Sequence, residues 1–172
     1  ASVAARVPAE LHPLLKQHPP GQGVSALAVT ADRGLCGSFN ANILRRSKRF
    51  LEEQEAASVG VVRLYLVGRK AMGYFKSHPV ETFGSMQDFF RDLNFSHGVK
   101  VAEELVAHYL AQKPTTLYVI YNEFKSAVAQ KLVIEPLLPF SRADLPPTGR
   151  TDYIYEPADP SGERIAPFYR RL

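Results

Sequence analysis

Residues 24–42 read VSALAVTADRGLCGSFNAN, and this stretch decides the fold class. Its opening run, Val24 to Thr30, is apolar and typical of a buried strand, and the turn-forming Asp32-Arg33-Gly34 ends that run. After Gly37 the sequence changes to a helical period, with one face formed by Ile43, Leu44, Ser47, Phe50 and Leu51. The stretch therefore predicts a strand, a tight loop and a helix in direct succession.

A second strand and helix follow in the same order. Val61 to Val67 (VVRLYLV) is another apolar run, and Gly68 stops it. A helical stretch then extends from Arg69 to about Ser77, before His78-Pro79. Because two successive strand-helix units are typical of parallel pairing, we expect a parallel sheet.

The next part of the chain is less regular. Residues 80–95 lack a clear period, and we expect at most a short helix over Met86 to Leu93. A longer helix should follow, capped by Ser96 and ending before Lys113-Pro114. Its predicted apolar stripe consists of Ala102, Leu105, Val106, Tyr109 and Leu110.

The remaining strands are predicted to form a hairpin. Leu117 to Tyr121 is apolar, the polar residues 122–126 follow it, and a β-rich segment from Ala127 to Glu135 is close enough to pair with it. The expected fold class is therefore α/β, with a mostly parallel sheet covered by helices and an antiparallel strand near the C-terminal part.

The length and composition suit one globular domain, since 172 residues with 45% hydrophobic content can bury a sizeable core. We expect a single domain over 1–172. It should consist of a connecting arm with one helical turn over 1–23, an α/β core over 24–140 and a proline-rich segment over 141–172. The last segment carries a possible edge strand at Tyr153–Tyr155 and a helix-like start at Arg170–Leu172.

Charge and cysteine content exclude little. The 21 basic and 17 acidic residues leave a net charge of +4, a modest excess that by itself identifies no partner. The single cysteine rules out an internal disulfide. No hydrophobic run has the length of a membrane span and the N-terminus has no signal-peptide core, so we expect a soluble chain without direct membrane insertion.

The loop over residues 32–40 is the strongest candidate for a ligand site. Open α/β sheets bind phosphates where a glycine-rich turn opens a helix, and this loop has that position. However, Gly34 and Gly37 make only G-x-x-G, and no lysine is placed to reach a terminal phosphate. Glycines for a tight turn are the favoured interpretation, and a flavodoxin-like nucleotide- or phosphate-binding enzyme that uses this loop stays open as the alternative.

Other catalytic or metal chemistry has weak support. Cys36 could be a reactive thiol near a helix start, but a buried, inert thiol is favoured because no histidine is paired with it locally. His97 and His108 are too far apart along a helix to share a metal, and no pair of carboxylates is placed across a cleft. We therefore expect no catalytic residue, no cofactor and no metal.

The densest charge cluster is formed by Arg45, Arg46, Lys48 and Arg49, which we call the basic face. Ion pairs with the following glutamates Glu52, Glu53 and Glu55 would explain it as a solvated surface. The order of basic before acidic residues is the less favourable one for a helix, which leaves open a second interpretation, an interface for an acidic partner. Nucleic acid is disfavoured because the sequence has no aromatic RNA-binding motif and no helix-turn-helix signature.

The whole loop carries a more specific pattern than its glycines alone. Residues 28–42 closely resemble a motif of the γ subunit of rotary F-type ATP synthases, and the matching positions are Asp32, Arg33, Gly34, Leu35, Cys36, Gly37, Asn40 and Asn42. The segments 67–75 and 121–126 resemble later parts of the same family. The likeness extends through nearly the whole chain.

The resemblance implies a Rossmann-like domain without a nucleotide site, in a subunit that makes and breaks no bond. Such a domain would be the foot of the central stalk. It would grip the ε subunit and the c-ring, and it would transmit rotation driven by protons or sodium ions to the catalytic subunits. Gamma subunits also begin and end with long shaft helices that reach the α/β hexamer, and these 172 residues contain none.

We therefore expect the globular domain without the terminal coiled-coil helices. The resemblance also implies a peripheral position at the cytoplasmic face of a bacterial inner membrane, or on the matrix or stroma side in an organelle.

Overall fold

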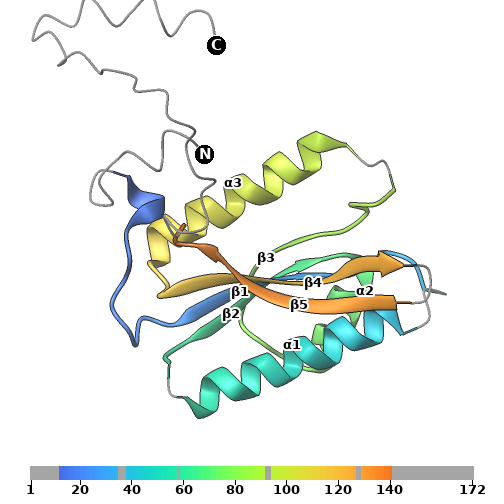
Figure 1. The fold of residues 1–172 in the computed structure, drawn as a ribbon, viewed down its shortest axis with the longest axis horizontal. Helices are drawn as coiled ribbons and strands as arrows, with labels where there is room; N and C mark the ends of the chain where they lie inside the picture. Colours follow the sequence, from blue (N-terminus) through green and yellow to red (C-terminus); the bar gives the residue numbers. More distant parts are fainter. Residues whose placement is uncertain (1–11, 35–37, 58, 92–93, 127–128, 141–172) are drawn as a thin grey trace, which may run out of the picture.

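The computed structural model describes residues 12–34, 38–57, 59–91, 94–126 and 129–140 (Figure 1). Within these ranges the chain forms one 3-10 turn, three α-helices and five strands, in the order η2 (Pro13–Leu15), β1 (Val24–Val29), α1 (Phe39–Ala56), β2 (Val62–Val67), α2 (Arg69–Ser77), β3 (Thr82–Met86), α3 (Phe95–Gln112), β4 (Thr116–Ser126) and β5 (Ala129–Leu138).

The five strands form one sheet in the order β3-β2-β1-β4-β5. Strand β1 is central and pairs in parallel with both β2 and β4, and β2 pairs in parallel with β3. Strand β5 pairs antiparallel with β4. The predicted α/β class, with a mostly parallel sheet and an antiparallel strand near the C-terminal part, is confirmed.

Helices cover both faces of the sheet. Figure 1 shows α1 and α2 on one face and α3 on the other. The α1–α2 side is centred on a cluster that includes Ile43, Phe50 and Leu64, and the α3 side is centred on Tyr65 and Tyr109. All five residues are nearly or fully buried, and because both faces of the sheet are covered, β1 and β2 are apolar except at Ser25 and Arg63.

The first helix and its buried face were predicted correctly. Ile43, Leu44, Ser47, Phe50 and Leu51 are all buried in α1. The second helix also has the predicted bounds, Arg69–Ser77.

The region between α2 and α3 differs from the expectation. Residues 82–86 form the edge strand β3 and not irregular chain, and no helix forms over the described part of 86–93. The sequence TFGSM of β3 is only partly apolar because an edge strand buries little surface, and its residues are half-buried or exposed. Helix α3 is capped by Asn94, whose side-chain oxygen accepts a hydrogen bond from the Ser96 amide at 3.0 Å, and Ser96 is therefore not the cap.

The buried face of α3 is also rotated from the predicted one. Val101, Leu105 and Tyr109 are buried, whereas Ala102 and Leu110 are exposed. The apolar arc of this helix is wider than the surface that the sheet can cover, so periodicity alone misplaced its centre.

The hairpin is longer than expected. Residues 122–126 continue β4 instead of separating two strands, because their backbones pair with the start of β5. Segment 12–23, expected only as a connector, is held against the domain. Leu15 is buried, and the Tyr109 hydroxyl donates to the Lys16 carbonyl at 3.0 Å. In the parts of the chain that the structure describes, no helix combines the length and apolarity needed to cross a membrane.

Candidate functional site

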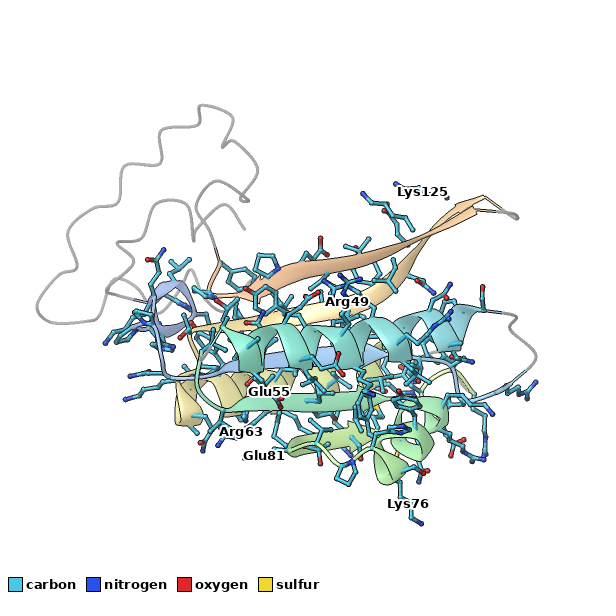
Figure 2. The ribbon with its side chains drawn as sticks, turned by 90° about the horizontal axis from the view of Figure 1, so that it is seen from below. Arg49, Glu55, Arg63, Lys76, Glu81 and Lys125 are labelled. Carbon is cyan, nitrogen blue, oxygen red and sulfur yellow. The ribbon has the colours of Figure 1, made fainter. Side chains whose placement is uncertain are left out.

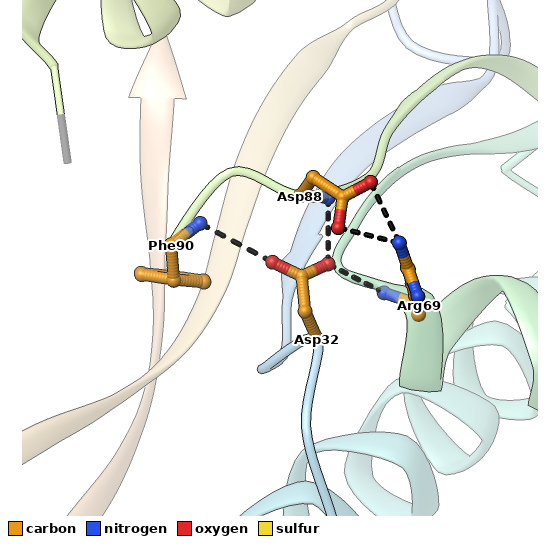
Figure 3. Close-up of polar contacts among 4 residues, drawn as sticks. All are labelled: Asp32, Arg69, Asp88 and Phe90. Atoms are coloured by element: carbon orange, nitrogen blue, oxygen red, sulfur yellow. Dashed lines mark hydrogen bonds and ion pairs between the residues drawn. The ribbon is translucent and has the colours of Figure 1, made fainter. Parts of the chain in front are cut away.

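The loop that follows β1, part of the motif over residues 28–42, lies where the carboxyl ends of the three parallel strands β1, β2 and β3 meet. The loop after β1 carries Asp32, α2 starts directly after β2, and residues 87–91 follow β3. Carboxyl ends of parallel strands open onto one edge of a sheet, so segments far apart in the sequence converge there. We call the group formed by Asp32, Arg69, Asp88 and Phe90 the Asp32 hub (Figure 3).

The carboxylate of Asp32 accepts three backbone hydrogen bonds in the hub. Its Oδ1 accepts from the amides of Arg69 at 3.1 Å and Asp88 at 2.8 Å, and its Oδ2 accepts from the amide of Phe90 at 3.2 Å (Figure 3). The amide of Arg69 is the first of α2, where a negative charge is stabilised by the helix dipole. One side chain therefore joins the β1 loop, the start of α2 and the segment after β3.

The carboxylate of Asp88 forms an ion pair with the guanidinium of Arg69 in the hub. Nη2 of Arg69 donates to both oxygens of Asp88, at 2.7 and 2.8 Å. The hydrogen bond to Asp88, and then the charge of Asp88, raise the pKa of Arg69 above its ordinary value. Asp88 itself has a backbone φ of 58°, a left-handed conformation that aspartate adopts more readily than most residues. In the hub, one carboxylate is thus paired with the arginine and the other is held by backbone amides.

The junction between β1 and α2 is also closed by a threonine and a glycine. Oγ1 of Thr30 donates to the Val67 carbonyl at 2.9 Å and accepts from the Ala71 amide at 3.0 Å. Gly68 has φ 92° and ψ 146°, a conformation almost restricted to glycine, and a Cβ there would overlap the Thr30 carbonyl oxygen. Glycine is therefore required at position 68 by both conformation and space.

The two asparagines of the motif make different contacts, Asn40 with backbone and Asn42 with a side chain. Oδ1 of Asn40 accepts from the Ala31 amide at 2.9 Å, and its Nδ2 donates to the Arg33 carbonyl at 3.2 Å, which closes the loop from inside. Oδ1 of Asn42 accepts from Nη2 of Arg45 at 2.7 Å. These contacts are structural.

Gly34 does not share the requirement found at Gly68. Its backbone is outside the positive-φ region, and an added Cβ would meet only the flexible end of the Lys70 side chain, at 3.4 Å. Neither observation requires glycine at position 34, and the expectation that the loop glycines serve a tight turn stays a prediction. Leu35, Cys36 and Gly37 lie outside the described residues.

A cavity of about 360 Å³ adjoins the hub, lined by Ala31, Asp32, Arg33, Arg69, Asp88, Phe90 and Arg91. In phosphate loops at this edge of a sheet, free backbone amides hold the anion. Here the amides of Arg69, Asp88 and Phe90 already donate to Asp32. These three amides are therefore satisfied by the protein's own carboxylate. Among the described residues, no group of three or more His, Asp or Glu side chains could hold a metal ion.

The basic face lies on α1, on the other side of that helix from its buried stripe. Arg46 and Arg49 both pair with Glu53, each at 3.0 Å, and Lys48 lies 3.7 Å from Glu52. Arg45 donates to Asn42 and to the Ala41 carbonyl. Of the expected ion pairs, those with Glu52 and Glu53 are present, whereas the described residues show none with Glu55, and the face has more basic than acidic side chains.

A groove of about 310 Å³ follows the basic face, lined by Asn42, Arg45, Arg46, Arg49 and Leu132. Its lining contains no carboxylate among the described residues. Whether this face binds a partner stays a prediction.

Comparison with known proteins now decides the family. Residues 1–171 match the family described as ATP synthase. The ATP synthase gamma chain of Chlorobium luteolum is 34% identical over 159 residues, which are 91% of this chain and 54% of that protein. The gamma chain of Chlorobium phaeobacteroides is 35% identical over 162 residues, 93% of this chain and 56% of that protein.

This chain belongs to the ATP synthase gamma-chain family. It spans about half the length of the curated gamma chains that it matches. A solved structure agrees in fold: a chain of the central stalk and c-ring of the Tetrahymena thermophila mitochondrial ATP synthase is 25% identical with a TM-score of 0.53, over 76% of this chain and 57% of that one. The resemblance expected from residues 28–42 is confirmed.

Sequence reasoning missed several residues of this gamma-chain site. Asp88 and Phe90 had no motif, and they join the hub through contacts with Asp32 that span more than fifty positions. Thr30 was assigned only to a strand, and Gly68 only to a strand end. The sequence feature that could have indicated this junction is Gly68. A glycine directly between an apolar strand and a helix often marks a backbone conformation that other residues cannot adopt.

Proposed function

We propose that this chain is the foot of the rotor, or central stalk, in the F1 sector of a proton- or sodium-driven ATP synthase. In this role it mechanically couples rotation of the c-ring to ATP synthesis or hydrolysis on the catalytic subunits. The match of residues 1–171 to the family, with gamma chains as relatives, is the observation that carries the proposal.

We further propose that the chain itself is non-catalytic. The Asp32 hub supports this reading, since its carboxylate satisfies the amides that a phosphate would otherwise use. Mechanical coupling requires stiffness, and a sheet packed between helices provides it because protein interiors are close-packed. A hub that ties three loops together adds to that stiffness at one edge of the sheet.

The proposed partners are the ε subunit and the c-ring, with contact to the α/β hexamer through shaft helices. The basic face, Arg45, Arg46, Lys48 and Arg49, is a candidate for an acidic surface on one of these subunits because its positive charge exceeds that of its glutamate partners. The complex would place this chain at the membrane periphery, on the cytoplasmic side in bacteria or on the matrix or stroma side in an organelle.

A chimaera tests the coupling function. Residues 24–140 replace the matching segment of the Chlorobium luteolum gamma chain, and membrane vesicles are assayed for ATP-driven ion pumping and for gradient-driven ATP synthesis. We expect assembly with the ε subunit and the c-ring and coupled activity of the same order as the parent. A vesicle preparation with the segment deleted is the control. A folded chimaera that never joins the complex would contradict the proposal.

Ligand binding tests the non-catalytic part separately. ATP, NAD and FMN are added to the isolated chain at micromolar concentration while its melting temperature and the amide signals of residues 30–42 are recorded. We expect neither to change. A saturable shift at the hub with any of the three would instead favour a nucleotide-binding protein.

A further inference from the structure

The groove beside the basic face lies between α1 and the last strand of the sheet. Three arginines and an asparagine of α1 line it together with Leu132 of β5. Helix α1 packs over β1, β2 and β4, and β5 is the strand at the end of the sheet. Figure 2 shows Arg49 on the side of α1 that is turned toward the β4–β5 hairpin. The groove therefore lies at the edge of the surface that α1 covers.

The charge in this groove is positive. Its lining contains three guanidinium groups and, among the described residues, no carboxylate. Two of the arginines share the carboxylate of Glu53, which is not part of the lining. The third, Arg45, donates to two neutral oxygens. Because one negative charge stands against three positive ones, the groove attracts an anion.

The contacts of the arginines also hold their side chains in place. Nη2 of Arg45 donates to Oδ1 of Asn42 at 2.7 Å, and Nε of Arg49 donates to Oε1 of Glu53 at 3.0 Å. A guanidinium carries several N–H groups in a planar fork, so these contacts leave donors for a further acceptor. A side chain that is already ordered loses less entropy when a ligand binds. The groove is thus prepared for an anion before one arrives.

The spacing of the arginines matches an extended acidic segment. Arg45 and Arg49 are four positions apart on α1, which separates them by about 6 Å along the helix axis. In an extended chain, side chains at alternate positions lie on one side and are about 6.6 Å apart. Carboxylates at positions i and i+2 would therefore reach one arginine each. A carboxylate and a guanidinium pair well because two parallel hydrogen bonds can join them.

The size and the lining of the groove favour such a segment over a helix or a phosphate. One turn of a helix with its side chains fills roughly 420 Å³, more than the groove offers at about 310 Å³. Leu132 is half-buried and packs against the α1-side core, so it presents an apolar contact that an inorganic phosphate cannot use. Phosphate sites often use the free amides at a helix start, whereas α1 begins at Phe39, well before Arg45.

We propose that the groove binds an extended segment of a partner subunit with the pattern acidic–apolar–acidic. The two carboxylates pair with Arg45 and Arg49, and the apolar side chain between them points the other way, toward Leu132. Lys48 lies on the same helix but does not line the groove, so it takes no part. The inference rests on the proposed function, in which the basic face meets another subunit, and it adds the conformation and the residue pattern that this subunit presents.

Peptide titration tests the pattern on the full chain. The peptide acetyl-TEVETT-amide carries its glutamates at alternate positions. The control acetyl-TEEVTT-amide has the same composition, but an extended chain turns its adjacent glutamates to opposite sides. The amide signals of residues 42–49 and 131–134 are followed. We expect the first peptide to bind at least tenfold more tightly than the control. Equal affinities would overturn the proposal.

Two charge reversals on one helix locate the binding site. Arg49→Glu should weaken binding of acetyl-TEVETT-amide at least tenfold, because a like charge then meets one of its carboxylates. Lys48→Glu makes the same charge change outside the groove and should alter the affinity less than twofold. Of the peptides acetyl-TKVETT-amide and acetyl-TEVKTT-amide, one should bind Arg49→Glu at least fivefold more tightly than acetyl-TEVETT-amide does. Equal losses in the two variants would overturn the proposal.

Inorganic phosphate and vesicles that contain cardiolipin separate the other anions. If either shifts the same amide signals at lower concentration than the peptide does, a phosphate group is the occupant and the proposal is overturned. The rotor assignment is tested apart from this, by the chimaera. A coupled chimaera together with equal binding of the two peptides would overturn the groove proposal alone, whereas a chimaera outside the complex would contradict the rotor assignment alone if the peptides still differ.

Discussion

The Asp32 hub and the basic face both contain arginine, but they neutralise its charge in different ways. In the hub, Arg69 is paired with Asp88 through two short bonds, and Asp32 satisfies three backbone amides. On the basic face, Arg46 and Arg49 share one glutamate, and Arg45 donates to two neutral oxygens, the Ala41 carbonyl and the Asn42 side-chain oxygen.

The difference indicates two kinds of work. A charge cluster that is complete within the chain holds structure, because breaking it leaves polar groups without partners. A cluster with excess charge on an exposed helix contributes little to folding, and its charge remains available to another molecule. We therefore expect hub changes to alter stability and basic-face changes to alter binding.

The largest effect is expected at Gly68, beside the hub. Gly68→Ala puts a Cβ against the Thr30 carbonyl and forces alanine into a glycine conformation, so the free energy of unfolding should fall by at least about 3 kcal/mol. Urea denaturation measures this. Gly34→Ala is the matched control, with an expected change within about 0.5 kcal/mol. Equal losses at both positions would remove the distinction between them.

A smaller loss is expected when the hub carboxylate is removed. Asp32→Ala leaves the amides of Arg69, Asp88 and Phe90 without their acceptor, and the free energy of unfolding should fall by about 2 kcal/mol. Asn42→Ala, which removes one exposed contact with Arg45, should change it by less than about 0.5 kcal/mol. Similar values for the two variants would mean that the hub does not support the fold.

A histidine outside the two arginine regions gives the fold a pH dependence near neutrality. His108 on α3 bonds the Ser25 hydroxyl at 2.8 Å and stacks on Phe83, and burial, followed by the charge of Arg63, lowers its pKa despite an opposing effect of Glu81. The unfolded chain then binds a proton more readily. The contribution of His108 is thus complete above about pH 6.5 and is lost as the pH falls from there toward its lower folded pKa.

Urea denaturation between pH 5 and pH 8 measures that contribution. The decline in unfolding free energy below about pH 6.5 should be smaller in His108→Gln than in the parent. Arg69→Gln should leave the slope with pH unchanged, which provides the comparison with the hub. If the unfolding free energy of the parent and of His108→Gln changed equally with pH, His108 would not be the source of the acid sensitivity.

The smallest effect on folding is expected on the basic face. Changing Arg45, Arg46 and Arg49 together to glutamate removes exposed ion pairs but places acidic residues nearer the N-terminal half of α1, so stability should stay within about 1 kcal/mol. Copurification with the ATP synthase complex should weaken, most clearly at low salt. Reversal of Lys76 and Lys125, which lie on other parts of the surface in Figure 2, should leave it unchanged. A severe folding defect in the triple variant would give the basic face a structural role.

Local patterns were sufficient for most of the elements. The helical stripe of α1 is buried at all of its expected positions, and the apolar residues of strands β1 and β2 are buried apart from the half-buried Val29, because central elements must be apolar wherever they face the core. Edge strand β3 was missed since TFGSM has little to bury, and the α3 stripe was misplaced since part of its apolar arc faces outward.

The hub could be predicted only in part. The family pattern pointed to Asp32 and Asn40, but not to what they bind. Asp88 and Phe90 bind Asp32 through their backbone amides. Because every residue except proline has such an amide, the residue type at these positions does not reveal the contact. Contacts of this kind depend on how the loops converge, which the local sequence does not encode.

The central place of β1 has a consequence for how the chain is made. Val24 pairs with Val62 on one side and with Thr116 on the other, so this strand has only one neighbour until β4 has left the ribosome. Pairings between distant positions form late because the intervening chain must first be ordered. During synthesis the β1 edge that later joins β4 is open to other strands, and an early product that stops before β4 would be prone to aggregate.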